Sequence, residues 1–352
     1  MTIQNISVSN FMLFSELNTS FSPNINIISG ENSSGKTALL KLLYAGTKSL
    51  DKLYSGIDEP TKKLMESVLA QKLQGVFRPN KNAIGRLVTR KQGRSKCDVS
   101  ICFDDASTLS FGFSSAAEKN LELASWNISI SPAAVYIPPK EIISATENFT
   151  SLYDDYHIAF EEVYYDLARL LDRPLKKGTK AASQQLVLEK LSALVNGSVT
   201  QKDRNFFLKV KDAGEFEMGL VSEGYRKLST LMYLISNGSL NENSILFWDE
   251  PETNMNPRMI QPLAEAVMEL SRMGVQVFIT THDYFVQQAF NLAAVYPDKE
   301  NAPDIRFYSL YKTEEGIALE TASVLGDLQH NAVMEEFDEL YDREQRLIYD
   351  ND

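Results

Sequence analysis

The sequence predicts an α/β protein in which a mixed sheet surrounds a phosphate-binding loop, accompanied by an antiparallel β subdomain and a helical insert. Three observations support this prediction. A strand, a glycine loop and a helix follow one another over residues 25–44. Short runs rich in Val, Ile, Phe and Thr, separated by turn residues, fill residues 85–137, as in an antiparallel sheet. Helical periodicity then dominates residues 151–194.

Length and composition indicate a globular protein. The chain has 352 residues, of which 43% are hydrophobic and 23% charged. No apolar run approaches the roughly eighteen residues that a membrane-spanning helix needs, and the first residues show no secretion signal. Cys97 and Cys102 would point to opposite faces of a strand, so we expect no disulfide between them. These features predict a cytoplasmic protein without a membrane partner.

The charge is unevenly distributed. A net charge of −12 disfavours non-specific binding to duplex nucleic acid. Residues 78–96, however, contain seven Lys or Arg and no acid, whereas residues 335–352 contain eight acids and two Arg. Both segments could be ordinary solvated surface. The basic segment could instead bind nucleic acid or an acidic partner.

The remaining elements divide the chain into one head with two elaborations. Residues Ile3–Val8 alternate as a half-buried strand does, and 25–28 form a second strand before the glycine loop. Further strands are expected in the runs GRLVTRK (85–91), KCDVSICF (96–103), STLSFGF (107–113), WNISI (126–130) and AAVYI (133–137), and at 205–211 and 215–221, with helices at 37–44, 51–75, 151–172 and 184–194. We therefore predict a nucleotide-binding lobe comprising 1–50 and 204–352, a helical and antiparallel β elaboration at 51–140, and a helical insert at 141–203.

The octet GENSSGKT at 30–37 carries the first site. Its glycines let backbone N–H groups turn toward an anion, and the following helix directs its positive end at the phosphates. Lys36 is expected to reach the β- and γ-phosphates of ATP, and the Thr37 hydroxyl to ligate Mg²⁺. The residues expected to bind ATP are Gly30, Asn32, Ser33, Ser34, Gly35, Lys36 and Thr37.

Two later strands end in polar residues that complete a nucleotide site. SILFWDE at 244–250 is a buried-type strand that ends in Asp249 and Glu250, at the strand end where ligands bind in α/β sheets. Asp249 is expected to hold Mg²⁺, and Glu250 to orient and deprotonate the attacking water. A second apolar strand runs into His282, placed where a γ-phosphate contact would be useful.

A third element, beginning at Ser222, presents a helix N-terminus. Ser222 can cap a helix with one apolar face over 228–235. A helix N-terminus binds anions. Because the loop at Lys36 already holds this chain's own phosphates, the anion here would belong to another chain.

In this order the motifs resemble an ABC-type ATPase head, and more narrowly the soluble heads of the structural-maintenance-of-chromosomes (SMC) and overcoming-lysogenization-defect classes. The likeness is strongest to short ATPases of prokaryotic anti-phage defence operons. The resemblance implies two heads that dimerise around ATP and Mg²⁺. It assigns a signature acting in trans to Ser222, Glu223 and Gly224, an interface-crossing D-loop to Asn254 and Asn256, catalytic roles to Glu250 and His282, and a Mg²⁺-binding glutamine to Gln74.

The sequence also departs from the transporter branch of this class. Ser222-Glu223-Gly224-Tyr225-Arg226 replaces the transporter signature Leu-Ser-Gly-Gly-Gln, and no Thr-Ser-x-Leu-Asp follows Pro251. For the adenine ring, Phe11 and Phe14 are the aromatic residues in a plausible region.

The leading functional hypothesis is an ATP-driven switch, dimeric or of higher order, that controls a separately encoded nuclease or toxin in anti-phage defence. Three alternatives stay open. A self-contained nuclease is disfavoured because the residues after His282 contain no acid cluster on alternating strands beyond Asp350-Asn351-Asp352. A transporter subunit is disfavoured by the signature. A chromosome or DNA-repair head is disfavoured because the insert is too short for an extended coiled coil.

Overall fold

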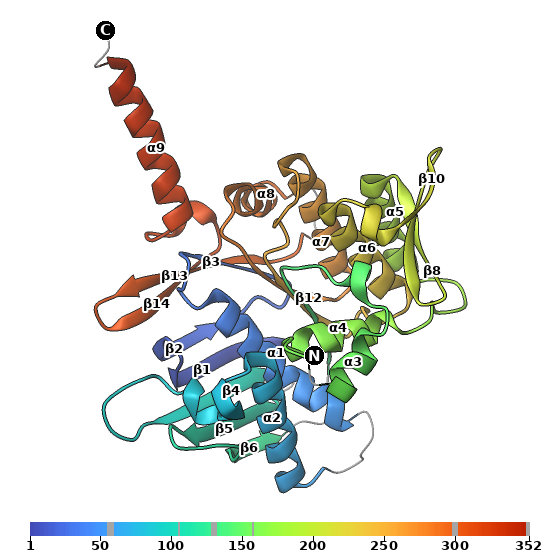
Figure 1. Cartoon of the computed structure of the whole chain (residues 1–352). Helices are drawn as coiled ribbons and strands as arrows, with labels where there is room; N and C mark the ends of the chain where they lie inside the picture. The colour runs from blue at the N-terminus through green and yellow to red at the C-terminus, as the bar shows by residue number, and fades with distance from the viewer. Residues whose placement is uncertain (55–59, 105, 128–131, 157, 298–301, 350–352) are drawn as a thin grey trace.

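A six-stranded mixed sheet carries the phosphate-binding loop near its centre (Figure 1). The computed structural model describes residues 1–54, 60–104, 106–127, 132–156, 158–297 and 302–349. The strand order is β14–β13–β3–β12–β11–β7, in which only β14 is antiparallel to its neighbour. The strands are β3 (Ile25–Gly30), β7 (Ala133–Ile137), β11 (Ser244–Asp249), β12 (Gln276–Thr280), β13 (Ile305–Thr313) and β14 (Gly316–Ala322).

Helices cover both faces of this sheet, and its central strands are therefore buried along their whole length. Along β11, Ile245 and Phe247 pack into a core shared with α1 and α2, whereas Leu246 and Trp248 pack into a core shared with α5 to α8. The helices are α1 (Lys36–Tyr54), α2 (Lys62–Phe77), α3 (Phe149–Tyr156), α4 (Glu162–Leu171), α5 (Ala182–Val195), α6 (Glu223–Ser236), α7 (Ile260–Arg272), α8 (Tyr284–Val295) and α9 (Ala332–Tyr349).

An antiparallel sheet of order β2–β1–β4–β5–β6 lies on the side of α1 opposite to the mixed sheet. Gly46 of α1 lies so close to this sheet that a Cβ atom there would be 2.7 Å from the Ile101 side chain. Helix α1 is therefore held between two sheets. The strands are β1 (Ile3–Phe11), β2 (Phe14–Ser20), β4 (Lys96–Phe103), β5 (Thr108–Ser114) and β6 (Glu122–Asn127), and a separate sheet contains β8 (Gly197–Lys202), β9 (Asn205–Val210) and β10 (Gly214–Glu217).

The sequence analysis placed the run AAVYI in the antiparallel sheet, and the structure shows that this prediction is wrong. The run forms β7, which pairs in parallel with β11, from Ala133 opposite Ser244 to Ile137 opposite Trp248. The physical reason is burial: β7 is apolar on both faces, as a strand of a covered parallel sheet must be. Conversely, β1 joins the antiparallel sheet. The division at residues 50 and 140 stays a prediction. The mixed sheet contains strands from either side of both boundaries, and the antiparallel sheet contains strands from either side of residue 50.

Several local predictions also need correction. Residues 84–87 form a 3₁₀ turn (Ile84–Leu87), followed by a single bridge between Val88 and Phe11, so GRLVTRK is not a strand. The helix expected over 151–172 is two helices, α3 and α4, and His157 between them lies outside the described residues. The strand expected at 215–221 ends at Glu217 and is followed by a 3₁₀ turn, Met218–Leu220. The last three residues of WNISI and Asp350–Asp352 lie outside the described residues.

A membrane-crossing role has no support in the helices. Among the described residues, none of the helices has both the length and the apolar character needed to cross a bilayer.

Candidate functional site

The phosphate-binding loop connects β3 to α1 and requires glycine at both ends. Gly30 has φ +146°, and a Cβ there would lie 2.3 Å from the Leu310 carbonyl oxygen. Gly35 has φ +98°, and a Cβ there would lie 2.6 Å from the Phe14 ring. Phe14 and Phe11 are both fully buried. Neither ring can stack on adenine, so that suggestion is wrong, and Phe14 instead supports the loop from below.

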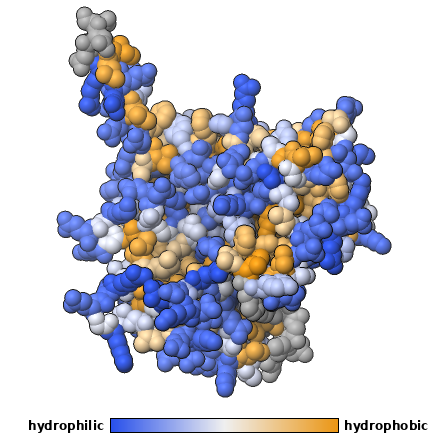
Figure 2. Space-filling model, viewed as in Figure 1, coloured by the Kyte–Doolittle hydropathy of each residue, from blue (hydrophilic) through white to orange (hydrophobic). Residues whose placement is uncertain are grey.

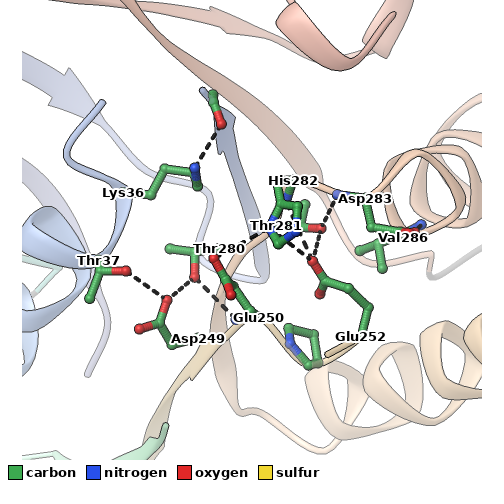
Figure 3. Close-up of polar contacts among 12 residues, drawn as sticks. Lys36, Thr37, Asp249, Glu250, Glu252, Thr280, Thr281, His282, Asp283 and Val286 are labelled. Carbon is green, nitrogen blue, oxygen red and sulfur yellow. Dashed lines mark hydrogen bonds and ion pairs between the residues drawn. The ribbon is translucent and has the colours of Figure 1, made fainter. Parts of the chain in front are cut away.

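Lys36 lies buried under the loop with its ammonium group surrounded by backbone carbonyls. Its Nζ donates to the carbonyl oxygens of Gly30 (2.7 Å) and Glu31 (2.9 Å). Figure 3 shows the Lys36 side chain hydrogen-bonded to a carbonyl oxygen. Burial lowers the pKa of Lys36, and the nearby carboxylates of Glu250 and Asp249 oppose that shift. A buried cation of this kind is stabilised by an incoming anion.

The middle of the loop presents further groups to a ligand. Asn32 and Ser33 are exposed, and Ser33 has φ +64°. The Ser34 hydroxyl is buried and has no hydrogen-bond partner within the described chain. Its free hydroxyl and the buried Lys36 ammonium fit a bound phosphate group.

Asp249 is the point at which four elements meet. Its Oδ1 accepts hydrogen bonds from the hydroxyls of Thr37 (3.1 Å) and Thr280 (2.5 Å), and its Oδ2 accepts one from Tyr136 (2.9 Å). Burial, together with the Asp249 charge, raises the pKa of Tyr136 well above its usual range, so the phenol stays protonated and donates. The oxygens of Thr37 and Asp249 are ligands of the kind that Mg²⁺ prefers. The structure thus brings together Thr37 and Asp249, two of the three expected metal ligands.

Glu250 and His282 also lie side by side. Glu250 adopts the left-handed conformation (φ +48°), and its amide donates to the Thr280 carbonyl oxygen at 3.0 Å. Its Oε1 is 3.3 Å from His282 Nδ1, and about half of the His282 side chain is exposed. Figure 3 shows both residues at the ends of adjacent strands. The left-handed turn after Asp249 directs one carboxylate at Thr37 and the next at His282.

Glu252 fixes the loop that carries His282. The carboxylate is buried, and its Oε1 accepts hydrogen bonds from the Thr281 hydroxyl (2.7 Å) and the His282 amide (3.4 Å). Burial raises its pKa, although the hydrogen bond from Thr281 opposes the shift. Asp283 then caps α8 by accepting from the Val286 amide at 2.9 Å. The backbone at His282 is therefore fixed by Glu252, which binds its amide, and by the capped start of α8 that follows it.

Lys227 of α6 supports the strained backbone at Glu250. Its side chain is almost completely buried, and Nζ donates to the carbonyl oxygens of Glu250 (3.2 Å) and Pro251 (3.4 Å). Burial lowers the pKa of Lys227. A left-handed conformation costs a residue with a Cβ about 1–2 kcal/mol. Lys227 is thus placed to stabilise that conformation from the helix that begins at Ser222.

The expected signature and D-loop residues contact each other within the chain. Glu223 Oε2 accepts from Asn254 Nδ2 at 2.8 Å, and Gly224 lies against the backbone of Met255. Ser222 occupies the N-cap position of α6 but makes no capping hydrogen bond, so the predicted cap is wrong, and the residue is exposed. Asn256 accepts from the Arg258 amide at 3.0 Å and caps the turn before α7.

Gln74 does not reach the metal ligands. It lies on α2, and its Nε2 donates to the carbonyl oxygens of Asn82 (2.6 Å) and Glu118 (3.3 Å). This corrects the expectation that Gln74 ligates Mg²⁺. The residue sits inside a helix that covers α1 and the antiparallel sheet, and its amide closes the adjoining loop.

Sequence reasoning missed four side chains that shape the site. They are Tyr136, Lys227, Glu252 and Thr280. The position of Thr280 at the end of an apolar strand was a usable signal. Tyr136 could not be found, because its strand had been assigned to the other sheet.

Comparison with protein families gives a match over residues 25–286, to the family described as "AAA domain, putative AbiEii toxin, Type IV TA system". The match runs from β3 through the first turn of α8 and so contains the loop, both acids and His282. The chain belongs to this family. The family assignment places the motifs identified from the sequence within one ATPase class.

Two solved structures share the fold of this family member. An SMC head bound to the C-winged helix domain of ScpA aligns over 93% of this chain and 99% of its own, with a TM-score of 0.57 and 13% identity. An SMC head with an extended coiled coil, bound to the C-terminal domain of ScpA derived from Pyrococcus furiosus, aligns over 97% and 99%, with a TM-score of 0.54 and 11% identity. This family member therefore has the fold of an ABC-type ATPase head.

A curated protein matches only a short stretch. The DNA replication and repair protein RecF of Idiomarina loihiensis is 52% identical over 44 residues, which is 12% of this family member and 12% of the length of RecF.

The buried environment of Lys36 leads to the first prediction. Lys36→Ala should weaken ATP binding by about a hundredfold, because charge-assisted hydrogen bonds contribute about 1.5–3 kcal/mol each. Since the lowered pKa means that the charged lysine is disfavoured in the free protein, the melting temperature without nucleotide should not fall. Isothermal titration calorimetry and thermal denaturation measure the two quantities.

The exposed Lys63 of α2 supplies a matched control. Lys63→Ala should change neither ATP affinity nor melting temperature. Unchanged ATP affinity in Lys36→Ala would show that the loop at 30–37 does not hold the phosphates.

Proposed function

We propose that this protein is an ATP-binding and ATP-hydrolysing switch. The observation that carries the proposal is that five residues meet at the carboxyl ends of the central strands of the mixed sheet: Lys36, Thr37, Asp249, Glu250 and His282. The loop binds the triphosphate through backbone amides and Lys36. Thr37 and Asp249 hold Mg²⁺, which when bound neutralises charge on the phosphates.

In this proposal Glu250 orients a water molecule and takes its proton. The carboxylate is only partly buried, so water can reach it, and His282 Nδ1 lies 3.3 Å from it. His282 contacts the γ-phosphate and holds the Glu250 side chain in position. General-base catalysis of this kind contributes about a hundredfold or more to the rate.

We further propose that two heads close around ATP. Ser222 is exposed, its hydroxyl makes no capping hydrogen bond, and α6 thus begins with amide groups suited to an anion. The contact between Glu223 and Asn254 puts the proposed signature next to the proposed D-loop. The signature of one head would then contact the nucleotide on the other, as a homodimer or as part of a higher oligomer.

The output of the switch is proposed to be a separately encoded effector, a nuclease or a toxin, in cytoplasmic anti-phage defence. The family description, which names a putative toxin of a toxin–antitoxin system, supports a defence role of this kind. The proposed binding surfaces for the effector are the insert at 78–200 and the acidic segment 335–352. All seven basic side chains of 78–96 are exposed, which also suits nucleic acid.

A DNA-repair or chromosome-type ATPase is the second candidate. The similarity to RecF favours it, although the match is confined to 44 residues. The two candidates differ in what should stimulate hydrolysis: DNA in the repair case, and the effector or its trigger in the defence case.

Glu250→Gln tests the proposed chemistry. This variant should bind ATP with unchanged affinity, hydrolyse it at least about a hundredfold more slowly, and accumulate an ATP-bound dimer. Phosphate release and sedimentation velocity measure these effects. Wild-type turnover would mean that Glu250 is not the base, and His282 would become the next residue to test.

Mixing two inactive variants tests the proposed action in trans. Lys36→Ala removes the phosphate contact, and Ser222→Arg blocks the signature. A mixed dimer contains one site built from an intact loop and an intact signature. Random 1:1 mixing makes half of the dimers mixed, so it should restore up to about a quarter of wild-type activity. If dimers form and no mixture recovers hydrolysis, each site is complete within one chain.

Co-expression with the neighbouring genes tests the proposed output. The Glu250→Gln dimer should co-purify with an effector encoded beside it, whereas the Lys36→Ala variant should retain less of it. The protein by itself should hydrolyse ATP slowly and leave DNA and RNA uncut with Mg²⁺ or Mn²⁺. Cleavage by the isolated chain, lost on mutating an acid other than Asp249 or Glu250, would contradict the effector proposal and favour a self-contained nuclease.

A further inference from the structure

Helix α9 projects away from the body of the molecule (Figure 1), and contacts at its base attach it to α8. Asn331 Nδ2 donates to Gln287 Oε1 on α8 at 2.7 Å, and Asn331 Oδ1 accepts from the Val333 amide at 3.2 Å. One turn further, the Phe337 ring stacks on Tyr284 of α8 with centroids 4.5 Å apart. These contacts fix the direction in which the helix leaves the body.

Beyond its base, α9 carries an apolar stripe. Phe337, Leu340, Tyr341 and Ile348 are 48%, 55%, 57% and 51% exposed, and their spacing places them on one side of a helix. Figure 2 shows hydrophobic atoms along this projecting arm. Most of the stability of a helix in a protein comes from packing of its apolar face, so an exposed stripe of this kind marks a contact surface.

The charges along α9 are arranged in two different halves. Residues 335–339 contain four acids and no base, whereas residues 342–346 contain Arg343 and Arg346 with two acids. Glu336 and Arg343 are seven residues, two helical turns, apart and therefore flank the same edge of the stripe. The helix thus presents an acidic half and a half that carries its basic groups.

We propose that the stripe on α9 packs against α9 of a second copy, with the two helices antiparallel. In that arrangement Glu336 of each helix lies near Arg343 of the other, twice by symmetry. A parallel pair would instead set the acidic halves against each other. It would also bring together the two copies of Glu344, the acid that interrupts the stripe.

The basic segment 78–96 is a poorer partner for the stripe, although its charge is opposite to that of α9. None of the large hydrophobic side chains that are exposed in the described chain lies in that segment. It could neutralise the acids but could not cover Leu340 or Tyr341. The stripe requires an apolar surface of similar length, and a second α9 supplies one together with complementary charges.

This contact does not depend on the proposed function and needs no nucleotide. Two single helices form an interface at the small end of the known range, so its affinity should be micromolar. If heads also close around ATP, the second two-fold contact either raises their effective concentration or links dimers into a larger assembly. The insert then remains the surface for an effector.

The first test measures self-association without nucleotide. Sedimentation velocity of the full chain at up to about 100 µM should show a concentration-dependent dimer, as expected for a small interface. Leu340→Gln with Ile348→Gln should weaken it at least about tenfold, because two buried apolar side chains are lost. Leu186→Gln, at an exposed position on α5, is the matched control and should have no effect. A wild-type chain that stays monomeric at every concentration would overturn the proposal.

The second test decides between a second α9 and any other occupant. Glu336→Arg and Arg343→Glu should each weaken the dimer by about two- to thirtyfold, since each breaks two symmetric surface ion pairs. Combining the two changes restores both pairs in an antiparallel homodimer and should recover the wild-type dissociation constant. A double variant weaker than either single one would contradict antiparallel pairing and point to another surface. Equal α9 helicity by circular dichroism excludes unfolding as the cause.

Discussion

Asp249 accepts hydrogen bonds from Thr37, Thr280 and Tyr136, and these three donors come from α1, β12 and β7. One carboxylate thereby fixes the start of the helix after the phosphate loop relative to the strands beside it. Each donor is a hydroxyl, so both oxygens of the buried carboxylate have hydrogen-bond partners. These hydrogen bonds fix the distance between Thr37 and Asp249, the two residues proposed to hold Mg²⁺.

Behind Asp249 a second layer of polar contacts extends into the helical elaboration. The Tyr136 ring lies 5.2 Å from the Tyr44 ring, and the Tyr44 hydroxyl donates to Asp166 at 2.6 Å. Asp166 is paired with the buried Lys72 of α2 at 2.9 Å. The carboxyl end of the central strands, where Mg²⁺ binding is proposed, is therefore connected to α2 and α4, which sequence reasoning had placed in separate elaborations.

Helix α6 connects two parts of the proposed cycle. Its N-terminus, at Ser222, is the surface proposed to contact a partner's nucleotide, and Lys227, five residues on, holds the backbone of Glu250. A shift of α6 on dimerisation would move Lys227, and Lys227 would in turn move the backbone of Glu250, the proposed general base of the same chain. This arrangement gives a physical route by which closure of one site could set the competence of the other.

The sequence by itself determined the chemistry: the glycines and Lys36 of the loop, and the acids and histidine at strand ends, follow from local rules on backbone conformation and on where parallel strands end. It could not determine which strands pair. AAVYI was assigned to the wrong sheet because adjacency in sequence is no guide to a parallel partner more than a hundred residues away. Only the tertiary structure therefore decided that Tyr136 holds Asp249, that Lys227 supports Glu250 and that Gln74 lies elsewhere, since each depends on long-range packing of side chains.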